Sequence, residues 1–261
     1  MSNVCVAIGV GDAPPLDYLR GAVNGATAVA KWAGQPDTSG APRYVTRLLT
    51  DELAPVEFSD VAAALHETLV AGGAERLLVY FAGHGLSTAA AADMWLLSSW
   101  NQTRQGVSVS GLVGRLGRYG VKQLVIVSDA CRSIVTVETR DVVANPVLER
   151  GPFEETNPQI DSWFAASPAR AAYMIPGKTA AEARCIFSGL FVEALRGAHT
   201  KAFGGGSPTG HVTNHSLADF LEQEVKVVAG RYRTNLEPAI STGIRPPRNV
   251  YLDSLPTPTP Q

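Results

Sequence analysis

Two short apolar stretches, each ending at a reactive side chain, constrain this sequence more than any other feature. Residues 77–83 lead directly into His84, and residues 124–130 lead into Cys131. Apolar runs without alternation are typical of strands that are buried on both faces of a parallel sheet. The chain between them is long enough for the crossover that parallel neighbours need. We therefore expect His84 and Cys131 at the same carboxyl edge, where open α/β sheets bind their ligands.

The residues at this edge are those that acyl transfer requires. A cysteine acts as a nucleophile in its thiolate form, and a nearby imidazole can remove the thiol proton or protonate the leaving amine. Gly85 lets the backbone approach a substrate closely, and its N–H can face a developing oxyanion. A single cysteine at a strand end is most often a small buried apolar residue, but the pair at two strand ends favours catalysis.

The motifs around both residues resemble those of caspase-like cysteine peptidases. Residues 81–85 read Phe-Ala-Gly-His-Gly and residues 129–133 read Asp-Ala-Cys-Arg-Ser, and the Cys follows the His by 131 − 84 = 47 positions. In the caspase family this separation is about 50 residues. The resemblance implies that His84 and Cys131 are the catalytic pair. It also implies that the backbone N–H groups of Gly85 and Cys131 form the oxyanion hole.

The same resemblance implies a fold. We expect an α/β protein, a caspase-like three-layer α/β/α sandwich around a mostly parallel six-stranded sheet. Residues 1–252 would form a single peptidase domain, and residues 253–261 a disordered tail. From the residue patterns we expect strands at 4–10, 43–49, 77–83, 124–130, 162–167 and 248–252, and helices at 16–33, 59–71, 108–119, 186–197 and 216–228.

Asp129 stands where true caspases carry Gln. Metacaspases and paracaspases carry Asp at this place and cut after Arg or Lys, so the resemblance implies basic specificity. A fixed carboxylate binds a guanidinium by charge-assisted, often bidentate hydrogen bonds, and it would repel an aspartate of the substrate. Metacaspases usually add an acidic residue in the first helix, where this sequence has Gly25. In caspase-like enzymes the segment of Ser167 runs beside the substrate, which makes Ser167 a candidate wall of the same S1 pocket.

Three alternatives stay open. Asp129 can instead cap backbone amides near the end of its strand. Asp12 or Asp17 can supply the missing second acidic group of the pocket. The whole chain can also be a non-catalytic caspase-like scaffold that binds a partner protein through the same cleft.

Residues 134–161 lack sustained periodicity and contain three prolines. Long irregular stretches in compact domains are usually functional or mobile. In the resembled family this region corresponds to the activation loop, and it contains Arg140 and Arg150. We therefore predict self-cleavage at these arginines, with a merely solvated loop as the alternative. For Arg132, beside the nucleophile, we predict a structural ion pair.

Composition limits the partners. The 22 basic and 24 acidic residues nearly balance, so no nucleic-acid partner is implied. No apolar stretch reaches membrane-spanning length and the first residues show no signal peptide, so we predict a cytoplasmic protein with no membrane partner. Three cysteines argue against a disulfide framework. No metal site or other cofactor is predicted, although many metacaspases require calcium.

The expected biology follows from the resemblance alone. It implies a protein substrate and an activator or regulator protein. Stand-alone caspase-like domains with a bacterial, alanine- and glycine-rich composition often resemble effectors of defence, antiviral defence included, or of regulated cell death. We therefore expect a regulated effector protease.

Overall fold

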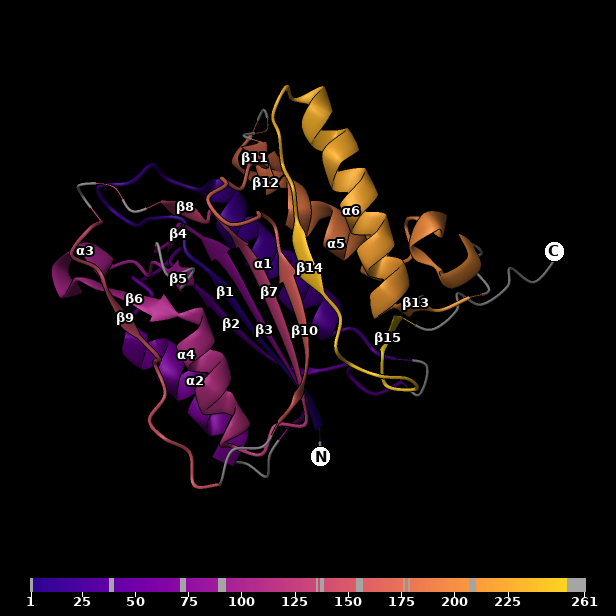
Figure 1. Cartoon of the computed structure of the whole chain (residues 1–261), viewed down its shortest axis with the longest axis horizontal. Coiled ribbons are helices and arrows are strands. Elements are labelled where there is room, and N and C mark those ends of the chain that lie inside the picture. Colours follow the sequence, from indigo (N-terminus) through magenta and orange to yellow (C-terminus); the bar gives the residue numbers. More distant parts are fainter. Residues whose placement is uncertain are drawn as a thin grey trace.

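A six-stranded central sheet organises the chain (Figure 1). The computed structural model describes residues 2–37, 40–70, 74–88, 93–134, 136, 139–153, 157–175, 177, 179–206 and 210–252, so the predicted tail at 253–261 lies outside the described residues. All neighbouring strands are parallel except β10 and β14, which are antiparallel. In their order across the sheet, the strands are β14 (Ala239–Ser241), β10 (Gln159–Phe164), β7 (Gln123–Ala130), β3 (Ala74–Gly83), β1 (Ser2–Gly9) and β2 (Val45–Thr50).

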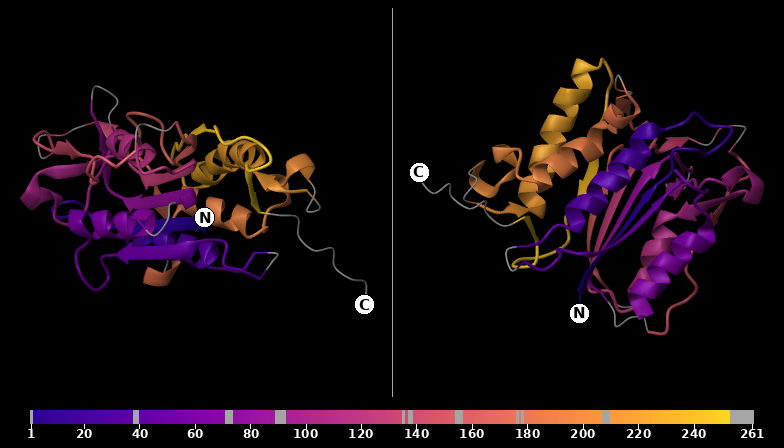
Figure 2. Two further views of the ribbon diagram at one scale, coloured as in Figure 1. Left: turned by 90° about the horizontal axis from the view of Figure 1, so that it is seen from below. Right: turned by 180° about the vertical axis from the view of Figure 1, so that it is seen from behind.

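Helices cover both faces of this sheet (Figure 2). Along β3, Leu78 and Tyr80 belong to the core on one face, and Leu77 and Val79 to the core on the other, which explains the absence of alternation in the sequence. The predicted three-layer α/β/α architecture is therefore confirmed. The first face carries α1 (Arg20–Ala33), α5 (Ile186–Leu195) and α6 (Asn214–Arg231), and the second carries α2 (Phe58–Val70) and α4 (Val109–Gly117).

A smaller five-stranded sheet lies at the carboxyl edge of the central one (Figure 1). One of its strands, β9, lies within residues 134–161, so that predicted irregular region is partly regular. The strands in order are β8 (Ser133–Ile134), β4 (Gly85–Ser87), β5 (Asp93–Trp95), β6 (Gln105–Ser108) and β9 (Val143–Asn145). The remaining elements are α3 (Trp100–Thr103), the pair β11 (Met174–Ile175) and β12 (Arg184–Cys185), the pair β13 (Val212–Thr213) and β15 (Val250–Leu252), and the 3-10 helices η1 (Ala180–Glu182), η2 (Thr200–Ala202) and η3 (Gly204–Gly206).

Several predicted elements differ from the structure in their bounds or pairing; the strand predicted at 162–167, for example, is β10 at residues 159–164. Helix α1 begins at Arg20 and not at residue 16, because a turn at Pro14–Leu16 precedes it. Helix α6 begins at Asn214, because the capping box joins Thr213 to Ser216, two residues before the predicted start. The predicted last strand at 248–252 does form β15, but it pairs with β13 outside the central sheet, and β14 takes the sixth place.

A fully buried carboxylate ties the C-terminal part of the chain to the sheet. Asp161 on β10 accepts hydrogen bonds from the Gly243 and Ile244 backbone N–H groups at 2.7 and 2.9 Å and from the Tyr251 hydroxyl at 2.9 Å. The Asn214 side-chain amide lies 3.1 Å from the same carboxylate. Asp161 thus joins β10, the start of α6, the segment after β14, and β15.

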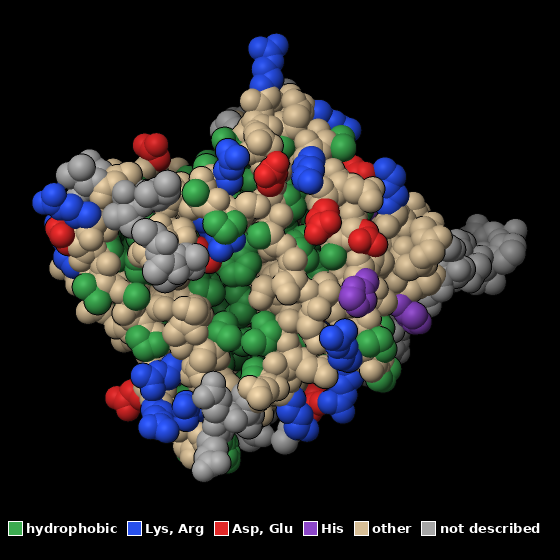
Figure 3. Space-filling model, viewed as in Figure 1, with side chains coloured by type: hydrophobic (Ala, Val, Ile, Leu, Met, Phe, Trp, Pro, Cys, Tyr) green, Lys and Arg blue, Asp and Glu red, His purple; other side chains and the backbone are tan. Residues whose placement is uncertain are grey.

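The surface carries both charge signs. Acidic and basic side chains are present over the face shown in Figure 3, with apolar side chains in the hollow at its centre. Within the residues that the structure describes, no helix combines the length and the apolar character needed to cross a membrane.

Candidate active site

His84 and Cys131 occupy matching positions on two neighbouring strands. In the parallel pair β3 and β7, Gly83 lies opposite Ala130, and each candidate residue is the next one along its own strand direction. The chain segments that follow also pair, because β4 runs parallel to β8 with Leu86 opposite Ser133. The two residues are therefore held at neighbouring positions by paired backbone both before and after them.

The backbone geometry turns the Gly85 N–H away from β5. The Leu96 N–H donates to the His84 carbonyl at 2.9 Å, and Gly85 lies opposite Trp95 in the antiparallel pair of β4 and β5. In such a ladder Gly85 belongs to a non-hydrogen-bonded pair, so its N–H points away from β5 and toward the Cys131 side. A Cβ atom on Gly85 would lie 2.5 Å from the Cys131 carbonyl oxygen, which explains why glycine is needed here.

The imidazole of His84 is held by a backbone oxygen. Its Nε2 lies 2.6 Å from the carbonyl oxygen of Asp17, and a carbonyl can only accept, so Nε2 carries the proton and donates. In the neutral ring Nδ1 then holds the lone pair. Burial lowers the pKa of His84, and the Asp17 carbonyl opposes this effect in part. The neutral imidazole can therefore act as a base at neutral pH.

Cys131 is a partly buried thiol that is covered by a loop residue. The Ala172 N–H donates to Sγ at 3.3 Å, and Sγ lies 3.7 Å from the Ala172 carbonyl oxygen. The Arg132 N–H donates to the Arg170 carbonyl at 2.9 Å, so residues 170–172 run against the nucleophile. Burial raises the pKa of Cys131, and the Ala172 N–H lowers it only in part. The resting thiol is therefore protonated at neutral pH.

Alkylation should report this pKa directly. We expect iodoacetamide to modify Cys131 in the folded protein slowly at neutral pH. The rate should rise with pH, and the midpoint of this pH profile should lie above the pKa of a free thiol, about 8.5. In urea the midpoint should return to the value of a free thiol, because burial is lost. Mass spectrometry of the Cys131 peptide after timed exposure measures both profiles. A folded-state midpoint below about 7 would instead indicate a preformed thiolate–imidazolium pair.

Asp129 is buried and contacts the start of α5. Its Oδ2 accepts the Ser188 backbone N–H at 2.8 Å and also the Ser188 hydroxyl, which in turn lies 2.6 Å from the Tyr80 hydroxyl. Among the described residues no hydrogen bond to Oδ1 is found. Burial raises the pKa of Asp129 to about 6, and the Ser188 contacts oppose that rise. The capping role that the sequence left open is thus present, and one carboxylate oxygen has no hydrogen-bond partner within the described part of the chain.

The position of the expected second acidic residue is filled by a hydroxyl. A Cβ atom on Gly25 would lie 2.5 Å from the Tyr80 hydroxyl oxygen. Asp12 lies elsewhere, where its N–H donates to the Asp51 carboxylate at 2.6 Å, and Asp17 contributes its backbone carbonyl to His84. Tyr80, a residue that the sequence placed only in a strand, therefore occupies the space next to Gly25.

Arg132 forms the predicted structural ion pair. Its Nε and Nη2 donate to the two carboxylate oxygens of Asp93 on β5 at 2.9 and 2.7 Å, and its guanidinium lies 4.8 Å from the centre of the Phe164 ring. This bidentate, stacked arrangement holds β5 against the loop that follows Cys131.

The remaining predicted residues have no hydrogen bond or ion pair with His84 or Cys131 among the described residues. The Ser167 N–H donates to the Glu237 carbonyl at 2.7 Å. The loop residue whose N–H contacts the Cys131 thiol is Ala172, five positions later. Arg140 is exposed and lies 3.7 Å from Asp141, and Arg150 lines a separate cavity with Arg115 and Arg118. Roles of Ser167, Arg140 and Arg150 stay predictions.

Sequence reasoning missed three contributors: the carbonyl of Asp17, the backbone of Ala172, and Ser188. The first two act through peptide groups, which leave no residue signature. Ser188 lies in the first turn of the helix predicted to start at residue 186. N–H groups in a first helical turn have no acceptor within the helix, and this could have indicated Ser188 as a donor to a nearby carboxylate. Among the described residues, no group of three or more His, Cys, Asp and Glu side chains is placed to hold a metal ion.

Comparison with known proteins identifies the fold. No family model matches the sequence, and no curated protein sequence matches it. Among solved structures, it is similar to the crystal structure of caspase-1 from Spodoptera frugiperda, with a TM-score of 0.56 over 97% of this chain and 92% of that chain. The chain has a caspase-like fold. Identity to that structure is 12%, so the caspase-like fold is what the two share, and the chemistry is argued from the residues above.

Proposed function

We propose that this chain is a cysteine endopeptidase that cleaves after a basic residue, with Arg preferred over Lys. The observation that carries the proposal is the placement of His84 and Cys131 at matched ends of β3 and β7, flanked by the paired strands β4 and β8. Cysteine and imidazole side by side at the carboxyl edge of a parallel sheet form a nucleophile and its base.

The mechanism follows from the groups at this edge. Nδ1 of His84 takes the thiol proton, and Sγ of Cys131 attacks the scissile carbonyl. The N–H groups of Gly85 and Cys131 stabilise the oxyanion of the tetrahedral intermediate. The protonated imidazole then gives its proton to the leaving amine, and water hydrolyses the thioester by the same route. The Asp17 carbonyl keeps the imidazole oriented throughout, through its hydrogen bond with Nε2.

Asp129 supports the basic specificity. Its carboxylate is buried, and the absence of a described partner on Oδ1 leaves one oxygen for a guanidinium. A bound guanidinium favours the charged carboxylate, whereas Asp129, with a pKa of about 6, becomes neutral in acid. Selectivity for Arg is therefore expected to fall as the pH drops below this value.

The test is hydrolysis of fluorogenic peptides that end in Arg, Lys or Asp, with and without calcium. Asp129→Asn keeps an acceptor for Ser188 but removes the charge, and we expect it to lower kcat/KM for Arg peptides by about 10- to 100-fold. Asp219→Asn, at an exposed site on α6, is the matched control and should behave as the unmodified protein. Equal Arg activity in both variants would exclude Asp129 as the pocket acid. Aspartate cleavage would exclude basic specificity itself.

Regulation is the second part of the proposal. Residues 170–172 lie against Cys131 and the thiol is protonated at rest, which fits an enzyme that an activator protein switches on, as in a bacterial defence or cell-death pathway. Self-cleavage at Arg140 or Arg150 would be a further switch. Incubation of active protein followed by gel electrophoresis tests it, and the absence of fragments would exclude self-cleavage. Lack of peptidase activity with every activator tried would favour the scaffold alternative.

A further inference from the structure

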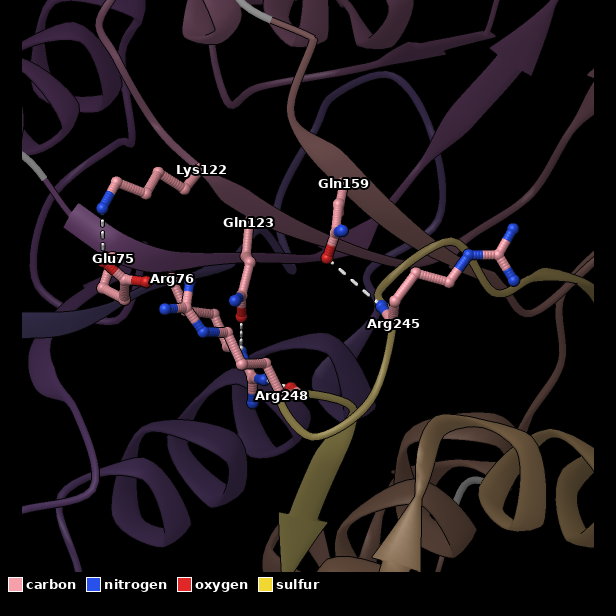
Figure 4. Close-up of polar contacts among 7 residues, drawn as sticks. All are labelled: Glu75, Arg76, Lys122, Gln123, Gln159, Arg245 and Arg248. Atoms are coloured by element: carbon pink, nitrogen blue, oxygen red, sulfur yellow. Dashed lines mark hydrogen bonds and ion pairs between the residues drawn. The ribbon is translucent and has the colours of Figure 1, made fainter.

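A cavity lies at the amino edge of the central sheet, where β7 and β10 begin with Gln123 and Gln159. Figure 4 shows the polar residues around it. Its volume is about 320 Å³, at the lower end of the range for small-molecule sites. Strand β7 spans eight residues, so its two ends are about 25 Å apart. The lining residues are Lys122, Gln123, Gln159, Arg245, Pro246, Pro247 and Arg248.

The two amide side chains of this cavity are oriented as donors. Oε1 of Gln123 accepts a hydrogen bond from Nε of the buried Arg76 at 2.9 Å. Oε1 of Gln159 accepts from the Arg245 backbone N–H at 3.2 Å. Because both amide oxygens are occupied, the NH₂ groups remain as donors, and neither has an acceptor among the residues that the structure describes.

The charges around the cavity are mostly positive. Lys122, Arg245 and Arg248 line it, and Glu75 beside it lies 3.2 Å from Lys122 and 2.5 Å from Arg248. Arg245 extends from the rim (Figure 4), and its guanidinium has no ion-pair partner among the described residues. Arg76, behind the cavity, adds a further cation. In a chain of net charge −2, this local excess of cations favours an anion.

We propose that this cavity binds a phosphate group, either as free phosphate or as part of a small phosphate ester. Ammonium, guanidinium and amide N–H groups are the donors that phosphate oxygens accept, and no acidic residue lines the cavity. Pro246 and Pro247 have no N–H and form an apolar wall against which the organic part of an ester can pack. The site is separate from the candidate active site, so the ligand does not compete with a peptide substrate.

Thermal unfolding of the full chain tests the site. Inorganic phosphate and adenosine monophosphate are titrated against chloride at matched ionic strength, and we expect a saturable rise of the midpoint temperature. Tighter binding of the nucleotide than of phosphate would assign the ligand as an ester, and equal binding would assign free phosphate. Because the cavity lies far from Cys131, the same rise is expected with Cys131→Ala.

The decisive variant is Gln159→Glu. The new carboxylate still accepts the Arg245 N–H, but it replaces the amide donor by a negative charge, so we expect at least about tenfold weaker phosphate binding. Lys122→Gln should weaken binding similarly, and Lys226→Gln, exposed on α6, is the control. All three residues lie at the surface or the cavity rim, so the folds should be retained. An equal rise in all variants, or no rise beyond that of chloride, would overturn the proposal.

Discussion

Replacing Cys131 by alanine is expected to abolish peptide hydrolysis, because the pairing of β3 with β7 places this thiol at the position next to His84. His84→Ala should lower kcat by about 10²- to 10⁴-fold, the usual contribution of a positioned acid–base group. The two variants separate the role of the nucleophile from that of the acid–base group, because His84→Ala still contains the Cys131 thiol. Fluorogenic Arg peptides measure the rates, and alkylation of Cys131 in His84→Ala shows that the thiol remains accessible.

The control for this prediction is Cys5→Ala. Cys5 is a fully buried thiol on β1 whose pKa is raised to about 12 by burial, so it cannot act as a nucleophile. Its replacement should reduce stability slightly and leave the rate unchanged. Activity that survives in Cys131→Ala and is lost in Cys5→Ala would contradict the assignment of the nucleophile.

The strands that carry the site were predictable because burial on both faces demands an uninterrupted apolar run. Strands β3 and β7 have such runs, and their common direction followed from the length of chain between them. Strand β14 was missed because an edge strand does not need a long apolar run. Its three residues, Ala239 to Ser241, pair with β10 on one side only. Three residues are too few to show a periodic pattern of apolar side chains. The stretch at 248–252 was long enough to be predicted as a strand, although it pairs with β13 outside the central sheet.

The candidate site divides in the same way. His84 and Cys131 were predictable because their residue types are reactive and because each follows the end of a strand, which places the two residues next to each other. The contact of Asp129 with Ser188 spans 59 positions and depends on where α5 begins relative to β7, which is decided by packing of α5 against the sheet. The contacts of Asp17 with His84 and of Ala172 with Cys131 involve backbone atoms of loops, so they could not be predicted from the types of these residues.

Asp161→Ala is expected to destabilise the fold by about 3–5 kcal/mol, a large part of the stability of an ordinary domain. The variant leaves the Gly243 and Ile244 N–H groups, the Tyr251 hydroxyl and the Asn214 amide without their acceptor in a buried place. Each buried donor without a partner costs about 1–3 kcal/mol, although water entering the cavity recovers part of this. Urea unfolding followed by tryptophan fluorescence measures the loss.

Two further variants show that the loss arises from these hydrogen bonds. Asp161→Asn keeps one acceptor oxygen but turns an NH₂ group toward two or three of the four donors, so its stability should lie between those of Asp161→Ala and the unmodified protein. Asp219→Ala, which removes an exposed carboxylate from α6, should change stability by less than about 0.5 kcal/mol. If Asp161→Ala were as stable as Asp219→Ala, the C-terminal segment would be held by apolar packing alone. The Asp161 hydrogen bonds would then orient β15 and the start of α6 without stabilising them.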